Sequence, residues 1–479
     1  MVYKALSLSA ALALLGVPMF AACSDDDDAS SEAAVSTEAG SGGAAQGSGG
    51  AQASAGRAAA GESGSQKSGG TDPEAPLPSE LTLPIVFVHG FAGSAQQFDS
   101  QAMRYVLNGF PADKLYAFEH DGAGTMLGDF VTNLDKYIDD VLKKHDAKQV
   151  YLIGHSRGTS VSSMYLSNPE QAAKVKKYVA EDGAGCANVP IPCASPAQTT
   201  NTRAGQTHPI PNQKHVEVAT SKESFAIQFE FLFDRKPKVL DIVKQKAPVV
   251  ISGRAVNFPA NTGRDGTKLT VWKVSSETGK RTGKDPLASF DIGADGKWGP
   301  VTVDPEAHYE FLLATEGQSG GHHFYMQHFP RSSEFVRLLS GPPDSDARVH
   351  SFTGDHTNLT VSRMREWTPE DKLEVGMADQ SAKNVISDAT GANRIAIYLQ
   401  DDPATPKESS LGLLPWFPEQ PFQTGVDLYL PASAAEPNAT IKLTNHPRGD
   451  SDHKQVINVP NWPSSEHTIS VLFSDYPQP

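Results

Sequence analysis

A serine between two glycines is the strongest chemical signal in the chain, in the segment GHSRG at residues 154–158. An apolar run typical of a buried strand precedes it at 149–153, and a helix-forming stretch follows at 159–166. Strand, tight turn and helix in this order form a nucleophile elbow, which exposes the serine hydroxyl. We therefore predict that Ser156 is a nucleophile. The segment GQSGG at 317–321 has the same pattern, but it lies between two strand-like runs and is interpreted as a β-turn.

A base must take the proton of Ser156 before its oxygen can attack a carbonyl carbon, and the chain order Ser, Asp, His places that base downstream. His215 lies on a loop before an expected helix, where Thr220 and Glu223 have the spacing of a capping box. A histidine there can reach over the end of the sheet, so His215 is the predicted base. His208 is interpreted as a solvated loop residue.

An acid must orient this histidine, and it should lie at the end of a strand between the nucleophile and the base. Asp182 lies there, directly before a glycine. Glu181 competes for the role, but side chains alternate along a strand, so only one of the two can face the histidine. We predict Asp182 because it lies at the turn itself.

The negative oxygen that forms during acyl transfer needs donors, usually backbone N–H groups. We predict the amide of Arg157, at the N-terminus of the helix after the nucleophile, and the amide of Phe91, in the loop HGFAG at 89–93. His89 is expected to brace this loop by hydrogen bonding. His155 is expected to pack beside the elbow, because adjacent residues there point away from each other.

These residues need a sheet that brings them to one edge. From about residue 80 the chain alternates strand-like and helix-like runs, which is the pattern of a doubly wound α/β sheet. The expected strands are 83–88, 114–118, 149–153 and 175–179, and the expected helices include 131–144.

From about residue 247 the helical periodicity stops, and short strands separated by Gly, Pro, Asn and Asp predict an all-β region, sandwich-like or barrel-like. The strands expected there are 249–258, 268–274, 309–313, 394–399, 425–430 and 467–473. We predict a catalytic α/β domain at 80–246 and β-rich domains at 247–345 and 346–479, although the two β-rich stretches could also form one domain.

The N-terminal residues are typical of an export signal. A short positive start and an apolar run too short to cross a bilayer comfortably predict a signal peptide at 1–22. The residues FAAC at 20–23 resemble the lipobox of bacterial lipoproteins, which predicts lipidation of Cys23; an ordinary secretory signal is the alternative. Residues 23–79 are polar and acidic and predict a disordered tether. We expect an exported protein, lipid-anchored in the bacterial cell envelope, with the outer membrane favoured over the inner.

The chain has three cysteines. If Cys23 carries lipid, Cys186 and Cys193 remain as a pair, and export favours a disulfide between them over two free thiols. They lie in a polar, proline-containing stretch at 184–212, between the predicted acid and base. We expect this stretch to form a lid or a substrate-pocket insertion.

Charge and histidine spacing bear on other classes of partner. The formal net charge of −15 argues against nucleic acid. His322, His323 and His328 cluster in a strand-like run, but alternation sends the first two to opposite faces, which disfavours a shared metal site. We predict neither a metal nor another cofactor.

Taken together, these residues resemble the bacterial and archaeal lipases of the α/β-hydrolase superfamily that are typified by the Archaeoglobus lipase and carry a C-terminal β-domain. The resemblance rests on IVFVHG at 85–90, GHSRG at 154–158, DG at 182–183, HVEVATSKESF at 215–225, ISGRAVNFP at 251–259, WGP at 298–300 and RLL at 337–339. It covers most of residues 80–345.

The resemblance implies hydrolysis of carboxylic esters of lipid-like substrates, without a metal and with a lid over the site. It implies the triad Ser156, Asp182 and His215, with the amides of Phe91 and Arg157 at the oxyanion. The tether and the cysteine pair depart from the family pattern and leave the acyl-chain preference and the lid open.

Two other functions remain compatible with these residues. A polyester or amide hydrolase would use the same triad, because the triad does not encode the leaving group. A surface binding protein with an inactive hydrolase fold would use its β-domains instead, and a fluorophosphonate would then leave Ser156 unlabelled.

Overall fold

The computed structural model describes residues 75–341, 354–377, 381–417, 420–433, 436–450 and 452–479. The predicted signal peptide, Cys23 and nearly all of the predicted tether lie outside these residues. No helix in the described part of the chain is both long and apolar enough to cross a membrane.

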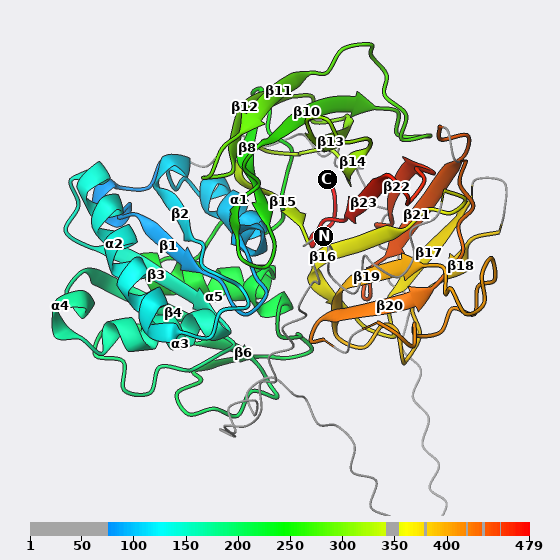
Figure 1. Ribbon diagram of the computed structural model, residues 1–479. Coiled ribbons are helices and arrows are strands. Elements are labelled where there is room, and N and C mark those ends of the chain that lie inside the picture. The colour runs from blue at the N-terminus through cyan, green and yellow to red at the C-terminus, as the bar shows by residue number, and fades with distance from the viewer. Residues whose placement is uncertain (1–74, 342–353, 378–380, 418–419, 434–435, 451) are drawn as a thin grey trace, which may run out of the picture. The chain divides into compact units, whose positions relative to one another are not determined.

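A five-stranded parallel sheet forms the centre of the first region (Figure 1), in the order β2-β1-β3-β4-β5. Its strands are β1 (Ile85–Val88), β2 (Leu115–Phe118), β3 (Val150–His155), β4 (Val175–Glu181) and β5 (Cys193–Ala194). Every residue of β1 is buried, which explains its unbroken apolar sequence. Short strands β6 (Pro196–Gln198) and β7 (His208–Ile210) pair beside this sheet.

Helices cover both faces of this sheet. They are α1 (Asp99–Leu107), α2 (Leu127–His145), α3 (Arg157–Leu166), α4 (Pro169–Ala172) and α5 (Lys222–Phe233), with 3₁₀ turns η1 (Ser79–Leu81), η2 (Ala95–Phe98), η3 (Ala112–Lys114) and η4 (Glu217–Ala219). Ile85 and Phe87 of β1 share a hydrophobic cluster with α1 and α5, whereas Val86 and Val88 share another with α2 and α3. Alternation along one strand therefore places a core on each side of the sheet.

The remaining strands form the β-rich part of the chain. From 249 to 340 they are β8 (Val249–Asn257), β9 (Thr262–Gly263), β10 (Thr267–Val274), β11 (Ala288–Ile292), β12 (Lys297–Val303), β13 (His308–Thr315), β14 (Gly321–Met326) and β15 (Ser333–Ser340). From 359 onward they are β16 (Leu359–Trp367), β17 (Lys372–Met377), β18 (Lys383–Asn384), β19 (Arg394–Gln400), β20 (Gln423–Asp427), β21 (Thr440–His446), β22 (Gln455–Pro460) and β23 (His467–Leu472).

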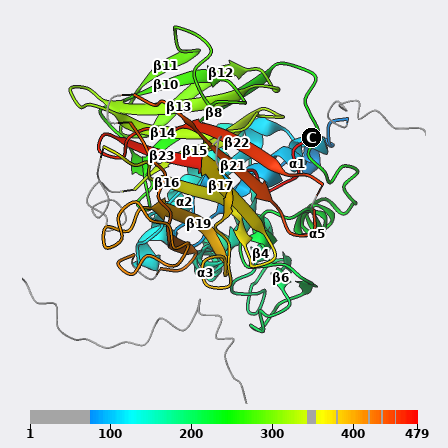
Figure 2. The same ribbon diagram turned by 90° about the vertical axis from the view of Figure 1, so that its right-hand side faces the viewer.

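One eight-stranded sheet joins the two β-rich stretches, in the order β11-β10-β13-β14-β23-β16-β19-β20. The joint is the parallel pair of β14 with β23, and Figure 2 shows the strands following one another from β11 at the top to β19 below. The four-stranded sheet β12-β8-β15, in which β9 also pairs with β8, shares one core with the first strands of the eight-stranded sheet. The sheet β18-β17-β21-β22 shares another core with the last strands.

The prediction of a doubly wound α/β sheet followed by a β-rich region is confirmed. Residues 317–321 form the turn between β13 and β14, where Gly317 and Gly320 have positive φ angles. The predicted capping box is wrong by one residue. Ser221 is the N-cap of α5 and accepts from the backbone N–H of Ser224, whereas Thr220 ends the preceding 3₁₀ turn η4.

Candidate active site

Ser156 lies at the turn between β3 and α3, with φ 54° and ψ −123°. This strained conformation requires small neighbours, because a Cβ on Gly154 would lie 2.8 Å from the carbonyl oxygen of Gly158. A Cβ on Gly158 would lie 2.1 Å from the carbonyl oxygen of Val88 on the neighbouring strand. The sequence therefore dictates the turn that presents the hydroxyl of Ser156, a residue that is 9% exposed as a whole.

His215 lies between Ser156 and Asp182 and is hydrogen-bonded to both. Its Nε2 is 2.8 Å from Ser156 Oγ, and its Nδ1 is 2.7 Å from Asp182 Oδ2. In this geometry Nδ1–H donates to the carboxylate, which leaves Nε2 to accept from the serine hydroxyl. The arrangement can accept the serine proton and stabilise the charge that this proton brings to the imidazole.

Asp182 is held from the other side by the stretch that follows it. Its Oδ1 accepts from the backbone N–H of Gln198 (3.1 Å) and from Nδ2 of Asn201 (3.0 Å). Burial by itself raises the pKa of Asp182, but the hydrogen bonds from His215 and Asn201 together lower that pKa below its ordinary value. The carboxyl is therefore kept ionised beside the imidazole.

Glu181 points away from this group. Its side chain is fully buried and accepts from Gln228 on α5. Burial raises the pKa of Glu181 well above its ordinary value. The alternation expected along the strand thus separates the two acids, and Asp182 is the one that contacts His215.

The loop that carries Phe91 runs directly against Ser156, the predicted nucleophile, since a Cβ on Gly90 would lie 2.7 Å from Ser156 Cβ. Phe91 and Ser156 line the same cavity. Arg157 is the first residue of α3, so its backbone N–H lies at the positive end of the helix dipole. The guanidinium of Arg157 donates to the carbonyl oxygens of the 121–124 loop at 2.6–2.9 Å and so ties that loop to the elbow.

His89 braces this loop as a neutral ring. Its Nδ1 donates to the carbonyl of Gly90 (2.9 Å), and its Nε2 accepts from the backbone N–H of His120 (3.2 Å). Burial and the neighbouring His120 lower the pKa of His89 to about 3. The ring is also stacked on His120, with 3.9 Å between centroids.

His155 does more than pack beside the elbow. Its Nε2 donates to the backbone carbonyl of His215 (2.9 Å), and its Nδ1 accepts from the amide of Gln97. Burial, followed by the proximity of His215, lowers the pKa of His155 to about 3. His155 is therefore a neutral residue that positions the backbone of the predicted base.

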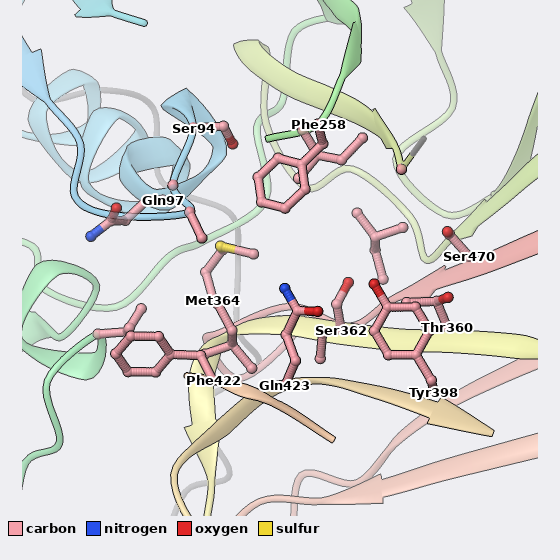
Figure 3. A pocket seen from close by; sticks show the side chains of 18 of the residues that line it. Ser94, Gln97, Phe258, Thr360, Ser362, Met364, Tyr398, Phe422, Gln423 and Ser470 are labelled. Atoms are coloured by element: carbon pink, nitrogen blue, oxygen red, sulfur yellow. The ribbon is translucent and has the colours of Figure 1, made fainter. Parts of the chain in front are cut away.

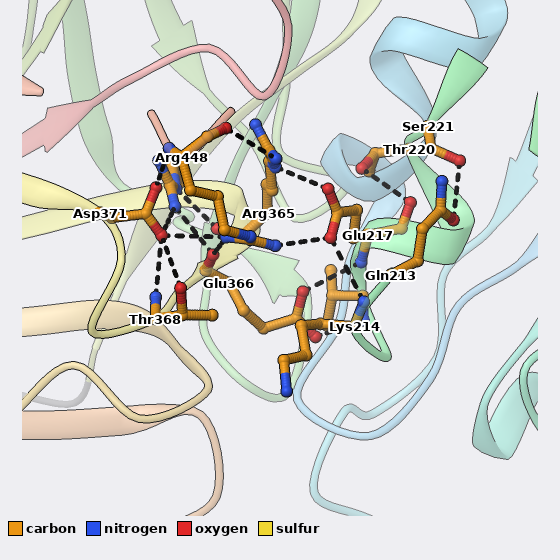
Figure 4. Close-up of polar contacts among 12 residues, drawn as sticks. Gln213, Lys214, Glu217, Thr220, Ser221, Arg365, Glu366, Thr368, Asp371 and Arg448 are labelled. Carbon is orange, nitrogen blue, oxygen red and sulfur yellow. Dashed lines mark hydrogen bonds and ion pairs between the residues drawn. The ribbon is translucent and has the colours of Figure 1, made fainter. Parts of the chain in front are cut away.

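Glu366 at the end of β16 also holds the His215 loop, from 150 residues away in the sequence. Its carboxylate accepts from the backbone N–H of Val216 and from that of Glu217, the latter at 3.0 Å. Arg365 and Arg448 each pair with one carboxylate oxygen of Glu217, at 2.8 and 2.5 Å, and Figure 4 shows the two ion pairs. Burial raises the pKa of Glu366. Among the residues that the structure describes, its buried carboxyl has no salt-bridge partner and accepts from two backbone amides.

The other β-rich stretch holds the opposite side of the site. Nδ2 of Asn261 donates to the carbonyls of Gly93 (2.9 Å) and His120 (3.0 Å). Arg337 and Arg254 pair with Glu119 at 3.0 and 2.7 Å, and Glu119 in turn accepts from the backbone N–H of Ala95 (3.0 Å). Residues from 254 to 337 thereby fix the loop that carries Phe91.

A cavity opens beside Ser156 and His215, with about 1470 Å³ of space counted to its open mouth. Its lining includes Ser156, His215 and residues of the eight-stranded sheet, and Figure 3 shows Phe258, Met364 and Phe422 around it. The described lining includes no residue from 184–212. The predicted pocket insertion is therefore wrong, because strands near the C-terminus cover the site while 184–212 holds Asp182.

A disulfide and strand pairing hold residues 184–212 in place. Cys186 and Cys193 are joined by a disulfide with 5.7 Å between their Cα atoms, and β5 extends the parallel sheet beside β4. His208 lies on β7 with an exposed side chain.

The three clustered histidines do not meet. His322 bonds to Ser340 and Ser470, and His323 bonds to Glu310 and His467 on the other face of the strand. His328 lies beside His308. Among the described residues, no group of three or more His, Cys, Asp or Glu side chains is arranged to hold a metal ion.

Three protein-family models match successive parts of the chain. A model described as serine aminopeptidase, S33, matches residues 81–221, and a lipase C-terminal domain model matches residues 247–343. A third model, described only as a C-terminal domain, matches residues 346–477. With the parallel sheet and the elbow, these matches show an α/β-hydrolase with a β-rich C-terminal region.

Several solved structures are similar to part of this chain, and some of them are described as hydrolases. They include a predicted CIB-like hydrolase of Thermoplasma acidophilum, at 15% identity over 33% of this chain and 90% of that chain with a TM-score of 0.26. A carboxylesterase of Bacillus cereus matches at 12% identity over 33% and 92%, with a TM-score of 0.24. An α/β-hydrolase enzyme from the sediment metagenome of the Mar Chica lagoon in Morocco matches at 15% identity over 34% and 92%, with a TM-score of 0.24.

Proposed function

We propose that this α/β-hydrolase is a serine ester hydrolase that cleaves carboxylic esters of lipid-like substrates through an acyl-enzyme. The observation that carries the proposal is the continuous hydrogen-bonded chain from Ser156 through His215 to Asp182. The match of residues 247–343 to a lipase C-terminal domain supports the choice of ester substrates.

In the proposed reaction, Ser156 Oγ attacks the ester carbonyl while His215 Nε2 takes its proton. The amides of Phe91 and Arg157 stabilise the resulting oxyanion. His215 then gives the proton to the leaving alcohol, and water repeats the cycle on the acyl-enzyme. Asp182 keeps the imidazole in the required tautomer throughout.

The cavity favours esters over the competing amide reaction. A serine aminopeptidase model matches the first region, so a peptide substrate is the second candidate. An aminopeptidase must hold a charged α-amino group, and the described lining of the cavity contains no Asp or Glu. Apolar side chains near the serine, among them Phe91 and Val216, suit the acyl part of an ester instead.

The cellular setting is a further part of the proposal. Cleavage before Cys23 and lipidation of its thiol would place the hydrolase at a membrane surface of the cell envelope, where ester lipids are available. No nucleic acid, metal or other cofactor takes part in the proposed reaction.

The test is hydrolysis of p-nitrophenyl esters of increasing acyl length by the full chain in a fixed detergent. We expect activity that rises with acyl length and falls about 10⁶-fold in kcat for Ser156→Ala. Ser167→Ala, at an exposed serine just beyond α3, is the matched control and should remain active. Amino-acid p-nitroanilides hydrolysed faster than any ester would overturn the ester assignment in favour of the amide one.

A further inference from the structure

The backbone is hydrogen-bonded to a carboxylate on each side of His215. Glu366 accepts from the N–H groups of Val216 and Glu217, which follow His215 in the chain. On the preceding side, the backbone N–H of Lys214 donates to Glu217 Oε2 at 3.2 Å. The carboxylate of Glu217 thus reaches back past His215 and closes a short loop around it. The position of this carboxylate therefore helps to determine the position of the predicted base.

Arg448 binds the same oxygen of Glu217 that accepts from Lys214. Its Nη2 donates to Glu217 Oε2 at 2.5 Å, whereas Nε of Arg365 donates to the other oxygen, Oε1, at 2.8 Å. Figure 4 shows both contacts as dashed lines. Arg365 therefore holds the outer oxygen, and Arg448 fixes the atom on which the backbone before His215 depends.

Asp371 orients Arg448 independently of Glu217. The backbone N–H of Arg448 donates to Asp371 Oδ1 at 2.8 Å, and its Nη1 donates to Oδ2 at 2.9 Å. Asp371 is itself fully buried and accepts from the backbone N–H of Thr368 and from Nη2 of Arg363, both at 2.8 Å. The guanidinium is thus preorganised, so little conformational freedom is lost when it binds Glu217.

Burial strengthens this pair of charges. The side chains of Arg448 and Glu217 are 9% and 10% exposed, and a charge-assisted hydrogen bond gains strength where water is excluded. Burial by itself lowers the pKa of Arg448, but Glu217 and Asp371 raise it above its ordinary value. The guanidinium therefore stays charged, and its removal would leave Glu217 without one of its two arginine partners.

The pair lies behind the base and outside the cavity. His215 and Val216 line the cavity, whereas neither Glu217 nor Arg448 is among its described lining residues. A substitution of Arg448 therefore leaves the substrate-contacting surface in place and acts on it only through the backbone around His215. The effect expected of such a residue is on turnover and not on substrate binding.

We propose that Arg448 is a positioning residue of the hydrolytic site. It fixes the oxygen of Glu217 that holds the backbone of Lys214, and so keeps the imidazole of His215 aligned with Ser156. The proposal rests on the serine hydrolysis proposed above, in which His215 is the base. It adds a residue that contacts neither substrate nor base and still affects the rate of proton transfer.

The first experiment measures turnover of a p-nitrophenyl ester by Arg448→Met in the full chain. We expect kcat to fall about tenfold with KM changed less than about twofold, because a displaced imidazole aligns less well with the serine hydroxyl. Arg448→Lys should recover part of the rate, since one ammonium can reach one carboxylate but cannot bridge Glu217 and Asp371 as the planar guanidinium does. A rise in KM without a fall in kcat would overturn the proposal.

Lys177→Met is the matched control for loss of a partly buried cation. The side chain of Lys177 is 16% exposed and its Nζ donates to the carbonyl of Phe231 and to Asp234, at the end of α5. Urea unfolding midpoints define conditions under which every variant is folded. Equal falls in kcat for Lys177→Met and Arg448→Met would show a general structural effect and would overturn the proposal.

A double-mutant cycle tests whether Arg448 acts through Glu217. Glu217→Ala removes the acceptor of the Lys214 N–H group and should lower kcat at least as much as Arg448→Met does. In that background Arg448→Met should lower kcat less than about twofold, since the atom that it fixes is already absent. A second tenfold fall there would show that Arg448 acts by another route.

The rate of fluorophosphonate labelling of Ser156 separates this proposal from the proposed ester substrate. Labelling requires the base but no ester, so it should slow about tenfold in Arg448→Met and remain unchanged in Lys177→Met. If the wild-type chain hydrolysed no ester but showed this difference in labelling, only the ester assignment would be contradicted. Equal labelling rates of the wild type and Arg448→Met would overturn the role of Arg448.

Discussion

The two β-rich stretches support opposite halves of the same site, and they do so with different chemistry. The stretch from β8 to β15 holds the loop of Phe91 through charged pairs on Glu119 and through the amide of Asn261. The stretch from β16 to β23 holds the loop of His215 through Glu366, and it also supplies both polar and apolar residues of the cavity lining.

We expect one stretch to contribute mainly to stability and the other mainly to the position of the predicted base. On the Phe91 side the supporting carboxylate is paired with two arginines, so its contribution is expected mainly in stability. On the His215 side the carboxylate accepts backbone N–H groups directly after the predicted base, so its contribution is expected mainly in the positioning of the imidazole. Mutations in the two stretches should therefore give different experimental signatures.

The largest effect is expected from Arg337→Met. The side chains of Arg337 and Glu119 are 8% and 4% exposed, so the substitution leaves a buried carboxylate with Arg254 as its remaining partner. We expect the free energy of unfolding to fall by about 3 kcal/mol, measured by urea denaturation. Lys273→Met, which removes a half-exposed pair with Asp304, should cost less than about 1 kcal/mol; equal losses in the two variants would contradict the assignment.

The second prediction concerns how the free energy of unfolding depends on pH. Burial raises the pKa of Glu119, but Arg337 and Arg254 outweigh it and lower the pKa from 4.5 to about 2. Between about pH 2 and pH 4.5 the unfolded state therefore binds more protons at Glu119 than the native state does. The stability that ionised Glu119 contributes above about pH 4.5 is lost as the pH falls towards about 2. The loss from this carboxyl is about 3 kcal/mol. Urea denaturation at several acidic pH values should show a shallower decline for Glu119→Gln, and an unchanged decline would refute the role of this carboxyl.

Glu366→Ala should act on turnover. Without the carboxylate, the amides of Val216 and Glu217 lose their acceptor and the His215 loop can shift. We expect kcat on a p-nitrophenyl ester to fall about 10²-fold with little change in KM. Glu366→Gln retains one acceptor oxygen and should restore part of the rate.

Glu374→Ala, at a half-buried surface pair on β17, is the control for this prediction. A rise in KM without a fall in kcat for Glu366→Ala would mean that Glu366 supports the cavity rather than the base.

The smallest effect is expected from Asn261→Ala, which removes the donor to the carbonyls of Gly93 and His120. Loosening of the Phe91 loop should lower kcat about tenfold, less than loss of a donor that contacts the oxyanion directly. Asn458→Ala, whose amide donates to Ser276 far from the cavity, provides the comparison. Equal kinetics for the two variants would show that Asn261 does not position the loop.

The sequence predicted the features that local chemistry determines. The glycines around Ser156 and the apolar run of β1 each specify a local conformation, and the parallel sheet follows from them. The helix start near Thr220 was predicted one residue early because Ser221 can cap equally well.

The supporting residues could not be predicted in this way. Glu366 and Asn261 reach the site through contacts with residues that are more than 100 positions away in the sequence. No local pattern encodes the parallel pairing of β14 with β23 that joins the two β-rich stretches. For the same reason the stretch 184–212, which is adjacent to the acid in sequence, was wrongly expected to line the pocket.

The most direct test of the central claim is mass-spectrometric mapping of a fluorophosphonate adduct on the full chain. A fluorophosphonate reacts only with a serine whose proton is removed by a neighbouring base. The account predicts one adduct, on the peptide that contains Ser156, and its loss in His215→Ala. An adduct on another serine, or no adduct on the folded wild-type chain, would contradict the claim that Ser156, His215 and Asp182 act together as a hydrolytic triad.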